Sequence, residues 1–235
     1  MEEALLEFSK GPLFRLCFGI MVLGLIRIFF LDIWGIYKAY RKAGDKPMPW
    51  KLILSRGLEW FFPVRRIGKN RPFYSIFSVL FHIGLIIVPI FLFAHVQLWK
   101  ESVGISWITL PYDWAYWLTI STIVFAIALL IGRVFNKTSS FLSRKQDYLW
   151  PILLLIPFIT GFVCASLNVD PKSYQFFMLM HVLSGDLIFV LIPFTKIAHC
   201  VLMPLSQVVC TIAWKFPPET DEAVCITLNK KGAKV

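Results

Sequence analysis

All four histidines of this 235-residue chain lie in long apolar stretches: His82 and His95 in one stretch, His181 and His199 in another. An imidazole in hydrocarbon is energetically costly, so an ionisable side chain at such a position is a candidate functional group. Neutral imidazole is also a common metal ligand. The paired distribution therefore predicts metal sites formed between two apolar segments.

The elements that must position these histidines are transmembrane helices. The chain is 57% hydrophobic and 16% charged, with a mean hydropathy of +0.69, which excludes a soluble enzyme. Because a helix needs about 20 apolar residues to cross a bilayer, we expect an all-α integral membrane protein with a five-helix bundle. The predicted spans are residues 12–37, 73–99, 112–135, 148–167 and 174–201.

These spans form one expected membrane domain, residues 1–205. The segment 38–72 mixes aromatic and basic residues, which favours an amphipathic helix at the membrane interface over a solvated linker. Residues 206–235 are expected to form an irregular tail that docks a partner or frays. The five cysteines show no C-x-x-C spacing, so we assign them no redox or cluster role.

The distribution of Lys and Arg predicts the orientation in the membrane. The segments 38–71, 133–145 and 196–234 together hold 19 of the 24 basic residues. Basic short loops stay on the cytoplasmic side, so the N-terminus should lie outside and the C-terminus in the cytoplasm. The net charge of +10 then reflects topology and attraction to anionic lipid, and it does not indicate a nucleic-acid partner.

This orientation places the histidines at two levels. His82 and His199 should share the cytoplasmic level, and His95 and His181 the outer level. In continuous helices the separations would be about 20 Å and 27 Å. Two stacked sites would each offer two neutral imidazoles from facing helices, which predicts bis-histidine ligation of two b-type haems. Such an iron carries electrons and has no open position for oxygen.

Helical phase leaves the number of haems open. His181 and His199 return to the same face, but His82 and His95 are about 140° apart in an ideal helix. Pro89 lies between them and is expected to kink or rephase the helix. If it does not, only His82 and His199 form a site and the protein holds one haem. Zinc is the weaker alternative, because no cysteine or carboxylate stands at ligand spacing.

Three strings carry a resemblance to a known family: "FHIGLIIVPIFLFAHVQLW", "DYLWPILLLIPFITGF" and "MHVLSGDLIFVLIPFTKIAHC". Over residues 74–205 the chain resembles cytochrome b subunits related to the respiratory nitrate reductase gamma subunit, especially those in transmembrane redox complexes of sulfate-reducing bacteria. The resemblance implies a dihaem, five-helix subunit of the bacterial inner membrane with an outside N-terminus. It also implies that His82 pairs with His199, and His95 with His181.

Other polar residues are candidates for supporting roles. Arg71, Arg133 and Lys196 stand at the cytoplasmic end, where each is either a haem-propionate partner or an ordinary positive-inside residue. Asp186 lies within the membrane, as a proton-relay or quinone-site group or as a buried partner of Arg27.

The outer edge offers the candidate quinone site. Lys100 and Asp113 lie at the right level beside a belt of Trp and Tyr residues, most of which anchor the interface. The resemblance implies that quinol, with menaquinone as the candidate, reacts near the outer haem.

These features predict a non-catalytic electron-transfer subunit of an oxidoreductase complex. It would relay electrons between the quinone pool, or a periplasmic multihaem cytochrome c, and a cytoplasmic iron–sulfur subunit. One alternative is a small proton-conducting or transporter-like protein without haem, against which stands the absence of an internal repeat. A purely structural anchor would leave the four histidines unexplained.

Overall fold

The computed structural model describes residues 2–42, 50–51, 53–55, 71–212 and 220–230, and their regular structure is helical. The helices are α1 (Glu2–Phe8), the π-helical turn η1 (Ser9–Leu13), α2 (Phe14–Lys42), α5 (Pro72–Phe91), α6 (Phe93–Val103), α7 (Tyr112–Phe135), α8 (Lys137–Leu142), α9 (Lys145–Ser166), α10 (Pro171–Leu191), the 3₁₀ turns η2 (Ile192–Phe194) and η3 (Lys196–Ala198), α11 (His199–Ile212) and α12 (Thr220–Thr227). They form two units, one with residues 1–20 and 67–191 and one with residues 21–66 and 192–235.

Among the described residues, five helical stretches are long and apolar enough to cross a membrane, so the predicted fold class is confirmed. They are Glu3–Lys38, Pro72–Phe91, Tyr112–Phe135, Lys145–Ser166 and Pro171–Phe194. Large apolar side chains such as Val124, Ile131 and Leu187 are about half exposed on these helices. Water would penalise such surfaces, whereas hydrocarbon accommodates them. The chain is a multi-helix transmembrane protein.

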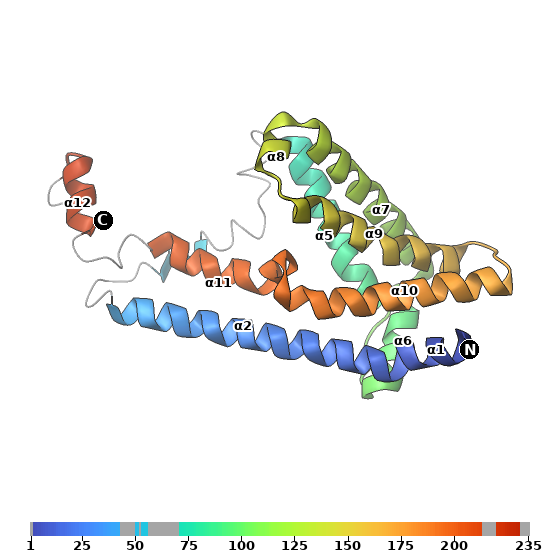
Figure 1. Ribbon diagram of the computed structural model, residues 1–235. Coiled ribbons are helices and arrows are strands. Elements are labelled where there is room, and N and C mark those ends of the chain that lie inside the picture. Colours follow the sequence, from blue (N-terminus) through green and yellow to red (C-terminus); the bar gives the residue numbers. More distant parts are fainter. Residues whose placement is uncertain (1, 43–49, 52, 56–70, 213–219, 231–235) are drawn as a thin grey trace. The chain divides into compact units, whose positions relative to one another are not determined.

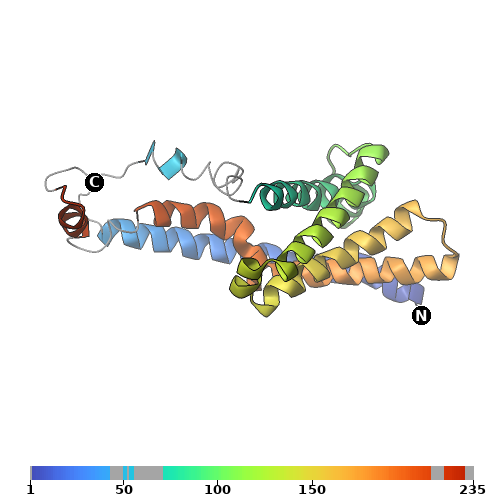
Figure 2. The ribbon, with the colours of Figure 1, turned by 90° about the horizontal axis from the view of Figure 1, so that it is seen from above.

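In the first unit, α5 contacts α7, α7 contacts α9, and α9 contacts α10, and Figure 1 shows these helices adjacent in that order. Figure 2 shows α9 and α10 running side by side from the loop that joins them. Small residues bring α5 and α7 close together. A Cβ atom at Gly84 would collide with the hydroxyl of Thr122, so only glycine fits there.

The second predicted span is not one helix. α5 ends at Phe91, Leu92 is extended with φ −64° and ψ 132°, and α6 begins at Phe93. Pro89 predicts a kink in this span, but the break lies three residues later, at Leu92. It is tolerated because two of the last carbonyls of α5 find backbone donors: Leu92 N–H donates to Val88 O at 3.0 Å, and Leu110 N–H to Phe91 O at 2.8 Å.

Aromatic packing holds α6 after this break. Trp99 of α6 lies edge-on to Phe14 and Phe18 at the start of α2, with ring centroids 5.4 and 4.5 Å apart. Phe189 of α10 contacts the same two rings at 6.0 and 6.2 Å. The Trp107 ring is tilted against Trp99, with centroids 5.9 Å apart, and its indole N–H donates to the Ile90 carbonyl at 2.8 Å. The direction of α6 is therefore fixed by large, rigid side chains.

A capped loop sets the start of α10. The Asp170 carboxylate accepts hydrogen bonds from the backbone N–H groups of Lys172 and Ser173, both at 3.1 Å, and Pro171 is the first helical residue. Hydrogen bonds from Ser173, first of all from its side chain, lower the pKa of the exposed Asp170 carboxyl. Asp170 is thus a carboxylate of the aqueous loop, ionised at neutral pH.

The second unit contains the rest of α2 together with η2, η3, α11 and α12. The fifth predicted span, 174–201, is interrupted here. Thr195 is extended with φ −135° and ψ −177°, and His199 begins α11. The expectation that His181 and His199 share a face of one continuous helix is therefore wrong. Within this unit, Gly24 lets α2 approach Pro193, because a Cβ atom would lie 2.5 Å from the proline Cβ.

Two predicted segments are only partly described. The interfacial helix at 38–72 falls mostly on residues outside the described ones, although Trp50, Lys51 and residues 53–55 are helical. The tail at 206–235 was expected to be irregular, but its described parts belong to α11 and α12. Short apolar periodicity in both stretches accounts for these helices.

Candidate functional site

His95 of α6 and His181 of α10 face each other in the first unit. Their ring centroids are 5.8 Å apart and the ring planes differ by 11°. The break at Leu92 changes the helical phase between α5 and α6, so the 140° offset expected for one continuous helix does not apply. The structure thus brings together the two histidines predicted at the outer level.

Hydrogen bonds fix both rings. His95 Nδ1 lies 3.0 Å from the Pro89 carbonyl, and His181 Nδ1 lies 2.8 Å from the Pro157 carbonyl. A carbonyl oxygen only accepts hydrogen bonds, so each Nδ1 carries the proton and donates it. In the neutral imidazole, Nε2 then has the lone pair. This arrangement, with one nitrogen donating to a backbone carbonyl, is typical of a metal-binding histidine.

A glycine makes room for the His181 ring on α9. Gly161 follows Pro157 by one helical turn, so a side chain there would cover the Pro157 carbonyl. A Cβ atom at Gly161 would lie 2.7 Å from His181 Cε1 and 2.9 Å from Nδ1. Real Cβ atoms essentially never approach so closely. The missing side chain of Gly161 therefore permits the hydrogen bond that orients His181.

The other two histidines show the same Nδ1 pattern. His82 Nδ1 lies 2.7 Å from the Ser78 carbonyl of its own helix, and His199 Nδ1 lies 2.7 Å from the Lys196 carbonyl. His82 belongs to the first unit and His199 to the second, so their pairing stays a prediction. His199 is exposed at the start of α11. All four imidazoles thus have the tautomer that leaves Nε2 as the basic nitrogen.

The separation of the His95 and His181 rings is compatible with an iron that would be held between two imidazoles. Metal–nitrogen bonds of about 2.0 Å to each ring would place the centroids of opposed imidazoles about 6 Å apart. The observed separation is 5.8 Å. Zinc fits less well, because within the described part of the chain no three His, Cys, Asp or Glu side chains are grouped closely enough to hold a metal ion. Two ligands complete a haem iron but not a tetrahedral zinc.

The predicted propionate partners at the cytoplasmic end have structural contacts. Arg71, before α5, donates to Ser139 Oγ at 2.8 Å and Asn136 Oδ1 at 3.4 Å. Arg133 of α7 donates to Ser143 Oγ at 3.0 Å. These bonds tie the α7–α9 connection to the start of α5. Lys196 lies in the second unit, so its predicted relation to a haem stays a prediction.

The structure separates the three residues predicted for a quinone or proton site. Lys100 on α6 and Asp113 in the first turn of α7 are both exposed, and no hydrogen bond or ion pair joins their side chains. Asp113 interacts favourably with the helix N-terminus. Asp186 is buried in α10, only 4% exposed. Arg27 belongs to the other unit, so its predicted pairing with Asp186 stays untested.

A small apolar groove lies beside His181 between α9 and α10. Its volume is about 210 Å³ and its lining residues are Leu153, Ile156, Met180, Leu183, Ser184, Leu187 and Ile188. Ser184 is the polar member, and its hydroxyl donates to the His181 carbonyl at 2.9 Å. Met180 and Ser184 flank His181 in the sequence, although His181 itself does not line the groove.

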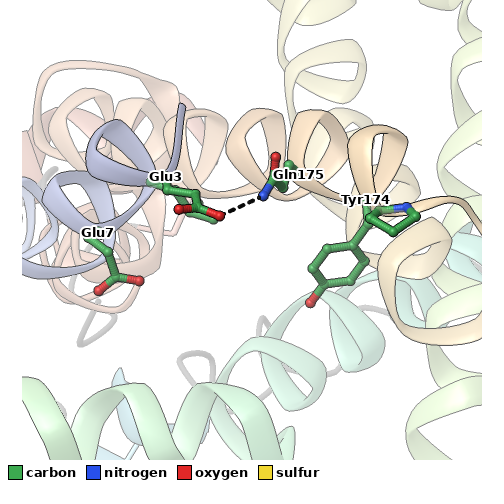
Figure 3. A pocket seen from close by; sticks show the side chains of 6 residues that line it. Glu3, Glu7, Tyr174 and Gln175 are labelled. Carbon is green, nitrogen blue, oxygen red and sulfur yellow. Dashed lines mark hydrogen bonds between the residues drawn. The ribbon is translucent and has the colours of Figure 1, made fainter. Parts of the chain in front are cut away.

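A second cavity, of about 390 Å³, lies between α1 and the start of α10. Glu3, Leu6, Glu7, Pro171, Tyr174 and Gln175 line it. Figure 3 shows Gln175 reaching Glu3, where the amide donates to the carboxylate at 3.3 Å. No predicted site residue lines this acidic cavity, and it is separate from the histidine pair.

Sequence reasoning missed the groups that orient the outer histidines. These are the carbonyls of Pro89 and Pro157 and the small Gly161. One signal was available, the proline and glycine one turn apart in the fourth span. The role of this proline and glycine depends on which helix packs against that turn. The periodicity of apolar residues does not predict which helix that is.

The chain is similar to a protein of the bacterium Nitratidesulfovibrio vulgaris (strain Hildenborough), with 32% identity over 151 residues. The match covers 64% of this chain, and it spans 66% of the relative, just under two thirds of its length. The relative's description names no activity. No family model and no solved structure matches the chain. The comparisons therefore give a distant bacterial homologue and no family.

Proposed function

We propose that this protein is the membrane electron-transfer subunit of a bacterial respiratory oxidoreductase complex and carries two bis-histidine b-type haems. The observation that carries the proposal is the opposed pair of His95 and His181, 5.8 Å apart, with each Nδ1 bonded to a backbone carbonyl. His82 and His199 have the same Nδ1 geometry and supply the second ligand pair.

In this proposal, a haem supplies one-electron chemistry and the chain supplies its environment. His95 and His181 hold one iron, and their carbonyl partners raise the basicity of the ligating nitrogens. His82 and His199 hold the other. The lipid-facing apolar surfaces of the helices exclude water from both sites. Arg71, Arg133 and Lys196 provide cations at the cytoplasmic end, where they favour anionic propionates.

The described helices are membrane spans and their connections, so in this proposal the electrons pass to and from partners. With the basic segments in the cytoplasm, the inner site would face an iron–sulfur subunit and the outer site would face a periplasmic multihaem cytochrome c or a quinone. The membrane placement is that of the bacterial inner membrane.

A reduced-minus-oxidised visible spectrum of the detergent-extracted protein, with haem quantified per chain, tests the proposal. We expect low-spin b-type bands and about two haems per chain. One haem would restrict the proposal to a single ligand pair. Folded protein without haem would overturn it and favour the proton-conducting alternative, in which the histidines form a proton path.

We further propose that a quinone, with menaquinone as the candidate, binds in the groove between α9 and α10. A quinone site needs an apolar slot, a polar group and a nearby redox centre. The groove offers apolar walls and the Ser184 hydroxyl, and two of its lining residues, Met180 and Ser184, lie within one helical turn of His181 on α10. Lys100 and Asp113 are less suitable, because both are exposed and neither lines this groove.

Filling the groove should slow quinol oxidation. We expect Leu187→Trp to reduce the rate of haem reduction by a menaquinol analogue about tenfold or more, since losing about 1.4 kcal/mol of binding changes affinity tenfold. Haem content and dithionite reduction should stay unchanged. Ile131→Trp is the control, because Ile131 is similarly exposed on α7. Equal rates in both variants would exclude this groove.

A further inference from the structure

Asp186 is a buried carboxyl group without a complete set of hydrogen bonds. It is 4% exposed, and its Oδ2 atom has no hydrogen-bond partner among the described residues. It lies five residues before the end of α10, within a segment that can span the membrane. An ionised carboxylate without a partner is costly in such surroundings, whereas a protonated carboxyl group is tolerated.

The surroundings of Asp186 offer few charges. Cys17, buried at the start of α2, is close enough to interact with it electrostatically. The guanidinium of Arg15 lies back toward Gly11. On α9, which packs against α10, the single titratable side chain between residues 150 and 165 is Cys164, near the opposite end from the basic α8–α9 loop. On α10 itself, His181 is the nearest titratable residue along the chain.

Asp186 is also close to the histidine pair. It follows His181 by five residues on the same helix, so the two Cα atoms are about 7.5 Å apart along the helix axis. A unit charge at roughly 10 Å changes a protonation equilibrium by about tenfold inside a protein. A change of charge at the His95–His181 site would therefore be felt by the Asp186 carboxyl group.

We infer that Asp186 is an intramembrane proton-binding site whose protonation is linked to the redox state of the His95–His181 centre. The inference rests on the proposed function, because it needs a haem at that pair. It deepens that function by coupling proton uptake to electron transfer. The geometry behind it is a buried carboxyl group whose Oδ2 atom lacks a hydrogen-bond partner, about one and a half helical turns from a candidate axial ligand.

The balance is one proton for one electron. When an electron from a quinol or a chemical mediator arrives at the centre, the Asp186 carboxylate binds one proton from the aqueous phase and becomes a neutral carboxyl group. When the electron leaves for an acceptor, the carboxyl group releases that proton. The net charge of the region then stays constant, which a low-dielectric environment favours.

Redox titration of the haem-loaded protein at several pH values tests this coupling. The equilibrium constant for reduction of the outer haem should fall by up to tenfold per pH unit, which is about 59 mV for one electron. Asp186→Asn should remove this dependence while both haems remain bound. Asp170→Asn is the matched control, because Asp170 lies in the aqueous loop and asparagine preserves its capping role. An unchanged pH dependence in Asp186→Asn would overturn the inference.

Infrared difference spectroscopy supplies a readout that separates this inference from the proposed function. A carboxylic C=O band should appear on reduction, vanish in Asp186→Asn and shift in Asp186→Glu. A carboxylate that stays ionised in both redox states, as pairing with Arg27 would require, contradicts the inference while leaving the haems in place. If no haem is found, the proposed function and the redox link fail together, and an infrared pH titration still shows whether Asp186 binds a proton.

Discussion

Replacing His181 with alanine is expected to halve the haem content, from about two haems per chain to about one. The imidazole is one of two candidate axial ligands at the outer site, and alanine offers no donor atom. The opposed His95 ring, 5.8 Å away in the intact protein, would remain without a second ligand. Haem extraction and quantification per chain, with the reduced-minus-oxidised spectrum, measures this loss.

His95→Ala should give the same haem content and spectrum as His181→Ala, because both variants remove one ligand of the same iron. The double variant should lose no more haem than either single one, as expected for residues that act as a unit. A His95→Ala protein that keeps both haems would show that His95 is not a haem ligand. A His181→Ala protein with both haems would exclude this pair as ligands.

The sequence predicts the membrane helices well because hydropathy acts within each helix. The third span, at residues 112–135, coincides with α7, Tyr112–Phe135. The two histidine-bearing spans are less well predicted, since each contains a break in the helix that hydropathy does not indicate. The Leu92 break is satisfied in part by Trp107 and Leu110, which donate to Ile90 and Phe91. The periodicity of apolar residues indicates where a helix is preferred. It does not indicate which distant groups bond to the ends of that helix.

The histidine site, like the helices, could be predicted from the sequence only in part. Residue type and membrane level placed His95 and His181 at the same depth, helical phase left their pairing open, and the structure brings the two rings together. The same reasoning placed His181 and His199 on one continuous helix, which the extended Thr195 contradicts. A residue's level in the membrane follows from counting along the chain. The direction in which its side chain points, relative to another residue, depends on every backbone dihedral angle between the two residues. One extended residue is enough to change that direction.

Gly161→Ala is expected to remove the outer haem without unfolding the protein. Replacing a helical glycine with alanine usually stabilises a helix by about 0.5–1 kcal/mol. Here the new Cβ would lie 2.7 Å from His181 Cε1, and overpacking of this kind costs about 1–3 kcal/mol. The ring relieves the contact by moving away from α9, which lengthens its 2.8 Å hydrogen bond to the Pro157 carbonyl. His181 then loses its orientation as a ligand, and the haem content should fall toward one per chain.

Gly185→Ala is the matched control for this prediction. Gly185 lies one turn after His181 on α10, and a Cβ atom there meets nothing within 4 Å. It should keep both haems and unfold at a temperature equal to or slightly above that of the original protein. If Gly161→Ala also keeps both haems with unchanged spectra, α9 does not orient His181. The loss of one haem in Gly161→Ala alone would mean that the absence of a methyl group on α9 determines the ligand geometry of α10, because the His181 ring reaches the Pro157 carbonyl past that glycine.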